Sequence, residues 1–305
     1  MQTNLPNFLI VGAAKSGTTS LYHYLKTNPQ IYLSSQRKEL RFFSDIKEDF
    51  QGPHDERFNS TIVRDIETYK SFFEDVKDET AVGDISPDYL FYYENSIKKI
   101  KRYLGNPKII IILRNPVDRA FSHWSHYRRD GKEDLSFEEA LETEQIRKEK
   151  NWEWGWRYKE VGLYYDQVKA YMENFTDVKV YLQDELHRDP AALVKEIFGF
   201  LGVDDTFVPP NLNEKFNVSG LPKSRYYHNF FRRDNLLKSL LRPIFKMIVP
   251  DETERQKIVN RLLQRNLEKM VIDTETRKKL QNFYKNDILK LQDLIGKDLT
   301  KWIAE

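Results

Sequence analysis

The sequence of 305 residues contains no cysteine. This absence excludes a disulfide framework, a thiolate metal site and a cysteine nucleophile, and it suits a reducing compartment. The chain also lacks a strong net charge, because 49 Lys and Arg residues and 47 Asp and Glu residues leave +2 at neutral pH. A balanced chain produces no overall positive field, so we expect no nucleic-acid partner.

Long apolar runs are missing as well. No stretch reaches the roughly 20 residues that a membrane-spanning helix needs, and residues 1–7 are too short and polar for a signal peptide. We therefore expect a cytoplasmic protein without a transmembrane segment. The content of 40% hydrophobic and 31% charged residues is typical of a globular protein. The length allows one large α/β domain or two small ones.

What the chain does contain is a strand, a small-residue turn and a helix start in direct succession, at residues 8–21 (FLIVGAAKSGTTSL). Residues 8–11 form an apolar run of β-formers and predict a buried strand. Gly12 and Gly17 allow the backbone to approach a ligand closely, and Thr18 opens a segment with helical periodicity. Free N–H groups and the helix dipole at such a helix start favour phosphate, so the segment predicts an anion site.

This turn differs from the P-loop that binds ATP or GTP, in which a lysine follows the second glycine. Here Lys15 precedes Gly17, and Thr18 takes the place of that lysine. A P-loop NTPase also needs an acidic residue to help hold Mg²⁺, whereas the aliphatic strand predicted at residues 108–113 is followed by Arg114. The sequence thus predicts phosphate held by cations without a metal. A P-loop-like kinase and a non-catalytic nucleotide-binding module are the alternatives from other classes.

Two motifs in this order resemble those of sulfotransferases that use 3′-phosphoadenosine 5′-phosphosulfate (PAPS) and release 3′,5′-adenosine bisphosphate (PAP). The pattern G-x-x-K-x-G-T-T-x-L at residues 12–21 is similar to their 5′-phosphosulfate loop. The pattern R-x-P with a following serine, at residues 114–122, is similar to their 3′-phosphate motif. The resemblance implies that Lys15 also stabilises the leaving phosphate, and that PAPS is bound by Lys15, Ser16, Gly17, Thr18, Thr19, Ser20, Arg114 and Ser122.

Two further segments resemble the heparan sulfate type of sulfotransferase in particular. Residues 38–43 (KELRFF) are similar to the K-E-x-x-F-F motif of those enzymes, whose glutamate is the catalytic base, so the resemblance gives this role to Glu39. The K-x-R pattern of Lys223, Ser224 and Arg225 resembles a loop that closes over the nucleotide, with serine in place of the usual glycine. The resemblance implies a glycan or glycolipid acceptor; a small alcohol or a carrier-bound polyketide hydroxyl is the alternative.

Three more residues are weaker candidates for contact with the acceptor: Arg41, Asp84 and Trp154. Asp84 lies in residues 83–87 (GDISP), which resemble the family's G-E-x-S-P segment with aspartate in place of the usual glutamate. At the end of a strand it is equally consistent with a structural carboxylate. Trp154 belongs to the tryptophan-rich residues 152–156, which either stack on a sugar or pack as a lid or helix end on the core.

The periodicity of the chain predicts a single α/β domain, a P-loop-like parallel sheet with helices on both faces and a helical C-terminal extension. We divide it into a nucleotide-binding core, residues 1–225, and the extension, residues 226–305. Ligands of open α/β sheets bind beyond the carboxyl ends of the strands, where Lys15, Arg114 and Glu39 are expected to meet. Strands are expected at 8–11, 31–33, 108–113 and 178–182, with a strand followed by a turn over 81–87. Helices are expected at 65–76, 95–104, 137–150, 161–175, 189–202, 235–249, 252–263 and 274–294, with a loop over 45–60.

Overall fold

The computed structural model describes residues 5–214, 220–222, 267–268 and 270–304. The chain divides into two compact units. The first unit comprises Met1–His123, Leu135–Asn217 and Asp273–Glu305, and the second comprises Trp124–Asp134 and Val218–Ile272. All described residues of the candidate site discussed below belong to the first unit.

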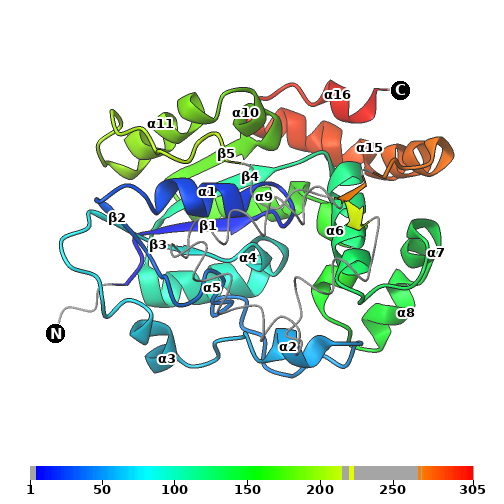
Figure 1. Ribbon diagram of the computed structural model, residues 1–305, viewed down its shortest axis with the longest axis horizontal. Helices are drawn as coiled ribbons and strands as arrows, with labels where there is room; N and C mark the ends of the chain where they lie inside the picture. Colours follow the sequence, from blue (N-terminus) through cyan, green and yellow to red (C-terminus); the bar gives the residue numbers. More distant parts are fainter. Residues whose placement is uncertain (1–4, 215–219, 223–266, 269, 305) are drawn as a thin grey trace, which may run out of the picture. The chain divides into compact units, whose positions relative to one another are not determined.

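The first unit is built on a five-stranded sheet in which all neighbouring strands are parallel (Figure 1). The spatial order is β2-β3-β1-β4-β5. The central strand β1 is buried along its whole length, as is β4 after its first residue, which is typical of strands covered on both faces. The predicted parallel sheet is thereby confirmed, with strands β1 (Phe8–Gly12), β2 (Ile31–Leu33), β3 (Ala81–Ile85), β4 (Lys108–Leu113) and β5 (Val178–Leu182).

Helices cover both faces of this sheet (Figure 1). On one face, Leu21 and Leu25 of α1 and Ile197 of α11 pack in one buried cluster with Ile10 and Ile110 of the central strands. Helices α4, α5 and α9 lie on the opposite face. The helices up to α6 are α1 (Thr18–Leu25), α2 (Asp55–Asn59), α3 (Ile66–Ser71), α4 (Asp88–Phe91), α5 (Tyr93–Leu104) and α6 (Pro116–Arg129); then follow α7 (Phe137–Glu142), α8 (Glu144–Glu149), α9 (Tyr165–Asn174), α10 (Gln183–Arg188), α11 (Pro190–Leu201), α15 (Thr274–Ile295) and α16 (Thr300–Ile303).

Several predicted helices are shorter than expected or are divided. The helix predicted over 137–150 is two helices, α7 and α8, although a capping box at Ser136 is present at its start. The helix predicted over 161–175 begins only at Tyr165, because Glu160–Gly162 forms a 3-10 turn. Helices α2, α4 and α10 were not predicted, since four to six residues are too few to show a helical period.

The C-terminal helix predicted over 274–294 is confirmed as α15, and it belongs to the first unit. The carboxylate of Asp287 on this helix accepts hydrogen bonds from the backbone N–H groups of Tyr164 at 2.8 Å and Tyr165 at 3.2 Å. These bonds fix α15 against the start of α9.

In the second unit, β6 (Leu221–Pro222) and β7 (Leu267–Glu268) form an antiparallel pair. The helices predicted over 235–249 and 252–263 lie outside the described residues. The boundary at residue 225 therefore stays a prediction.

Candidate active site

The candidate site lies at the carboxyl ends of β1 and β4, which are neighbours in the sheet. The connection after β1 leads to β2 on one side of the sheet, and the connection after β4 leads to β5 on the other. Loops that diverge in this way leave a crevice where open α/β sheets bind ligands. Lys15 follows β1 and Arg114 follows β4, and Arg114 Nη1 donates a hydrogen bond to the carbonyl oxygen of Lys15 at 3.2 Å. The two predicted phosphate-binding motifs are therefore in direct contact.

The turn between β1 and α1 directs the start of the helix toward this crevice. Lys15 and Gly17 both have left-handed backbone geometry, with φ of 66° and 111°. Gly17 is the N-cap of α1 and supplies no side-chain hydrogen bond to the helix, so its first N–H groups remain available to a ligand. A Cβ atom at Gly17 would lie 2.9 Å from Leu186 Cδ2, so a larger residue would also require the Leu186 side chain to shift. The geometry suits an anion at the helix start.

Ser16, between these two residues, provides a test of whether the implied donor fits. Its hydroxyl is fully buried and has no hydrogen-bond partner among the described residues. The hydroxyl of Tyr164 donates instead to the carbonyl oxygen of Arg114 at 3.1 Å. An unpaired buried hydroxyl costs about 1–3 kcal/mol, and a phosphate oxygen in the turn would remove that cost. The residues of the turn thus fit the phosphosulfate group of PAPS.

Across the site, the carboxylate of Glu39 is held between two cations. Lys38 Nζ donates to Glu39 Oε1 at 3.1 Å, and Arg41 Nη2 donates to Glu39 Oε2. Arg41, whose φ is 57°, also donates from Nη1 to the Glu39 carbonyl oxygen and to Thr61 Oγ1, both at 3.2 Å. Burial raises the pKa of Glu39, but Lys38 and Arg41, together with Lys15, lower it below its usual range. The carboxylate is therefore ionised at neutral pH and can accept a proton.

The segment that carries Glu39 is attached to the end of β3 through Ser86. Ser86 Oγ accepts hydrogen bonds from the backbone N–H groups of Leu40 at 2.9 Å and Arg41 at 3.2 Å. The same hydroxyl donates to Asp84 Oδ1 at 3.0 Å. A side chain that bonds two successive amides fixes the backbone beside Glu39, and with it the direction of the carboxylate.

Asp84 is 2% exposed and stands at the centre of three hydroxyl groups. Besides Ser86, the hydroxyls of Tyr89 and Tyr69 donate to Asp84 Oδ2 at 2.6 Å and 3.1 Å. Burial raises the pKa of Asp84 to about 7. This arrangement matches the structural carboxylate of the two sequence alternatives, and contact between Asp84 and the acceptor stays a prediction.

Trp154 packs behind the turn between β1 and α1. It is 5% exposed and lies in one buried cluster with Ala14 and Val161. Its ring stacks on Phe91 with 5.9 Å between the ring centroids. This burial matches the alternative in which the tryptophan-rich segment packs on the core. Contact between Trp154 and a sugar stays a prediction.

The other residues predicted to bind the nucleotide include Ser122, Lys223, Ser224 and Arg225. Ser122 is buried in the first half of α6, and its contact with a 3′-phosphate stays a prediction. Lys223, Ser224 and Arg225 lie outside the described residues.

Among the described residues, no group of three or more His, Asp or Glu side chains is placed to hold a metal ion. No helix in the described part of the chain is long and apolar enough to cross a membrane.

Two residues of the site were not identified from the sequence, namely Lys38 and Ser86. Lys38 Nζ donates to Thr19 Oγ1 at 3.0 Å in addition to its bond to Glu39, so it connects the first turn of α1 to the carboxylate. Its position directly before the glutamate in the K-E motif is the signal that could have pointed to it. For Ser86, the signal is its place in the turn predicted to follow a strand.

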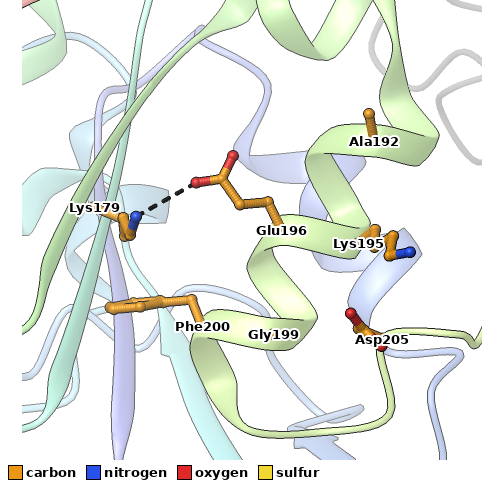
Figure 2. A pocket seen from close by; sticks show the side chains of 7 residues that line it. All are labelled: Lys179, Ala192, Lys195, Glu196, Gly199, Phe200 and Asp205. Carbon is orange, nitrogen blue, oxygen red and sulfur yellow. Dashed lines mark ion pairs between the residues drawn. The ribbon is translucent and has the colours of Figure 1, made fainter.

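A separate hollow of about 500 Å³ lies along α11 and the edge strand β5 (Figure 2). The ammonium of Lys179 and the carboxylate of Glu196 form an ion pair there at 3.5 Å, and Phe200 and Asp205 line the end of the hollow near the end of α11. The residues that line it include none of those predicted for the site, so it is not part of the candidate active site.

Comparison with known proteins gives a family match and several relatives. Residues 5–217 match the family model described as "Sulfotransferase domain". A crystal structure of a sulfotransferase from Alicyclobacillus acidocaldarius superposes with a TM-score of 0.76 at 36% identity, covering 98% of this chain and 99% of that one. The match extends over nearly the whole of both chains and supports the fold described above.

Two curated relatives match over shorter stretches. The membrane-associated sulfotransferase kil1 of Dictyostelium discoideum is 31% identical over 149 residues, which cover 46% of this chain and 28% of that protein. The human bifunctional heparan sulfate N-deacetylase/N-sulfotransferase 3 is 28% identical over 225 residues, which cover 65% of this chain and 22% of that protein. The chain thus matches less than a third of the length of either relative.

Proposed function

The chain belongs to the sulfotransferase domain family, and from this premise we propose that it transfers a sulfuryl group from PAPS to a hydroxyl or amine of a glycan or glycolipid. One observation carries the proposal: hydrogen bonds join the anion site to the carboxylate of Glu39. Arg114 contacts the Lys15 turn, and Lys38 connects the start of α1 to Glu39. Sulfuryl transfer requires charge neutralisation at the leaving phosphate and a base at the attacking group.

On the donor side, the backbone N–H groups at the start of α1 bind the phosphosulfate, and Lys15 neutralises the charge that develops on the leaving phosphate oxygen. The unpaired hydroxyl of Ser16 adds a donor in the same turn. Arg114 and Ser122 bind the 3′-phosphate. The contact between Arg114 and the Lys15 carbonyl supports these separate roles for Lys15 and Arg114, since it places a fixed cation beside the turn.

On the acceptor side, Glu39 removes the proton of the attacking hydroxyl or amine. Its lowered pKa keeps it ionised at neutral pH, and each carboxylate oxygen has lone pairs beyond those used by Lys38 and Arg41. The attacking atom forms a bond to sulfur while the bond from sulfur to the leaving phosphate oxygen breaks. The electron pair of that bond stays on the phosphate, and the proton stays on Glu39.

A glycan or glycolipid is the acceptor class that the relatives favour. The human relative is named for heparan sulfate N-sulfotransfer, which is transfer to an amine of a glycan, and its match covers 65% of this chain. The Dictyostelium relative is named as membrane-associated, which supports including a lipid-linked sugar among the acceptors to be tested.

The proposal is tested first by nucleotide binding. We expect calorimetry to show that PAP binds more tightly than AMP or ATP and that Mg²⁺ does not change its affinity. Transfer of radioactive sulfate from PAPS to an amino oligosaccharide, a neutral glycolipid and a simple alcohol then identifies the acceptor class. Magnesium-dependent binding of ATP with phosphate transfer would favour the kinase alternative, and PAP binding without transfer to any acceptor would favour the non-catalytic module.

A further inference from the structure

The ammonium group of Lys38 lies between the two halves of the site. Its Nζ donates to Thr19 Oγ1 at 3.0 Å, in the first turn of α1, and to Glu39 Oε1 at 3.1 Å. These are its two hydrogen bonds within the described part of the chain, and an ammonium has three N–H donors. The side chain is 19% exposed, so it is accessible from the crevice while its position is fixed by neighbours.

This position matters because the sulfuryl group must travel between the same two places. On the proposed function, the group starts on the phosphate bound at the start of α1 and ends on an acceptor atom beside Glu39. An ammonium that contacts Thr19 at one end and Glu39 at the other lies beside that path. We propose that Lys38 is a further catalytic residue that binds the nonbridging oxygens of the sulfuryl group during its transfer, an inference that rests on the proposed function.

The other cations of the site are committed to different tasks. Arg41 donates to both the carboxylate and the carbonyl oxygen of Glu39 and to Thr61, and its guanidinium lies 4.7 Å from the centre of the Phe58 ring. It therefore positions the carboxylate. Lys15 belongs to the leaving side, in the turn that binds the phosphate. Lys38 donates hydrogen bonds both to the donor helix, at Thr19, and to the acceptor carboxylate, at Glu39.

The proposed step exchanges one hydrogen bond of Lys38. In the PAPS complex, the third N–H donor of Lys38 binds a sulfuryl oxygen. As the acceptor atom forms its bond to sulfur and the sulfur–phosphate oxygen bond breaks, Lys38 also shifts a donor from Glu39 Oε1 to the sulfuryl group. The shift frees a lone pair on Oε1 and makes the carboxylate more basic as it takes the acceptor proton. Lys38 remains protonated throughout, and the leaving electron pair remains on the phosphate beside Lys15.

Binding of PAPS compared with PAP tests this role, because the two nucleotides differ by the sulfuryl group. In Lys38→Met the affinity for PAPS should fall by about ten- to hundredfold, the range of a charge-assisted hydrogen bond, while the affinity for PAP changes little. Lys38→Arg should recover part of the preference. The matched control is Lys26→Met, which removes a lysine bonded to Tyr22 OH at 3.0 Å outside the site and should affect neither nucleotide.

A pH profile separates this role from a merely structural one. Glu39 faces Lys38, Arg41 and Lys15, with Asp88 as a neighbouring acid. Removing the charge of Lys38 raises the pKa of Glu39, so the acid limb of PAPS turnover should move to higher pH in Lys38→Met and stay in place in Lys26→Met. Water serves as the acceptor if the screen has identified no other.

The outcomes distinguish this inference from the proposed function. Wild-type protein that binds neither PAP nor PAPS would refute the proposed function itself. Wild-type binding of both, with equal losses or no loss in Lys38→Met, would overturn the role of Lys38. Lys38→Gln keeps a hydrogen-bond donor without the charge and supplies the same comparison if the methionine variant does not fold, as judged by its thermal melt.

Discussion

The donor and acceptor walls of the site are built in different ways. The donor wall is one contiguous turn, from Gly12 to Thr19, whose form comes from left-handed backbone geometry and the start of a helix. The acceptor wall is the irregular segment of residues 38–41. Its backbone is fixed by a hydrogen bond to Ser86, which lies 46 positions after Leu40 in the chain. Changes in the first wall should therefore alter the affinity for PAP, whereas changes in the second should leave the affinity for PAP in place and alter rate and pH dependence.

The largest expected effect is on the acceptor wall, in Glu39→Gln. This change keeps the shape of the side chain and removes its capacity to accept a proton, so the rate should fall by about 10²–10⁴-fold. The affinity for PAP should stay near that of the wild type, because Glu39 lies on the acceptor side. Turnover and calorimetry on the same preparation, with a thermal melt to verify folding, measure both. Near wild-type turnover would remove Glu39 as the base, and a loss of PAP binding would contradict the division into two walls.

The next largest effect is expected beside the donor wall, in Arg114→Ala, because Arg114 contacts the Lys15 carbonyl of that wall. A charge-assisted hydrogen bond to phosphate contributes about 1.5–3 kcal/mol, which is roughly ten- to hundredfold in affinity. The preference for PAP over AMP should therefore largely disappear, while the acid limb of the pH profile stays in place. Competition binding with the two nucleotides measures the preference. An unchanged preference would show that Arg114 does not read the 3′-phosphate.

A smaller effect is expected from the carboxylate that supports the acceptor wall. The pKa of Asp84 is raised to about 7 in the folded protein, against about 3.9 in an unfolded chain. Protonated Asp84 therefore stabilises the folded protein. This stabilisation is fully present below about pH 4 and is lost as the pH rises through about 7. Asn cannot ionise, so the melting temperature of Asp84→Asn relative to wild type should rise between pH 4 and pH 8.

The exposed Asp78→Asn provides the matched control for this measurement. Its melting temperature should follow that of the wild type across the same pH range. A difference between Asp84→Asn and wild type that stays constant with pH would show that Asp84 does not bind a proton on folding.

The smallest expected effect is that of a chelator, which should have none. On the proposed function, cations of the protein neutralise the leaving phosphate, so turnover should survive EDTA. The assay compares initial rates before and after treatment, and after Mg²⁺ is added back. A complete loss that Mg²⁺ restores would assign part of the donor wall to a metal ion.

The contrast between the donor wall and the acceptor wall also explains which parts of the fold and the site could be predicted from the sequence. The strand of residues 8–12, the turn after it and the start of α1 are contiguous, so their residues carry the whole pattern of the donor wall. The aliphatic run of β4 likewise identifies a strand covered on both faces. Contact between Lys15 and Arg114 followed from the rule that ligand sites lie at the carboxyl ends of parallel strands.

The acceptor wall depends on contacts between distant segments, which no local pattern specifies. The motif pointed to Glu39, but the bonds of Lys38 to Thr19 and of Ser86 to Leu40 join separate loops. The burial of Trp154 is likewise a result of packing, because exposed and buried tryptophans look alike in a sequence.

Lys15 and Arg41 are non-glycine residues with left-handed backbone geometry, with φ of 66° and 57°. That geometry costs an ordinary side chain about 1–2 kcal/mol relative to its preferred conformation, whereas glycine and asparagine adopt it readily. Thermostability and turnover therefore make opposite demands at both positions. Variants selected for heat resistance alone would therefore accumulate glycine or asparagine at positions 15 and 41. Their melting temperature would rise while their turnover fell.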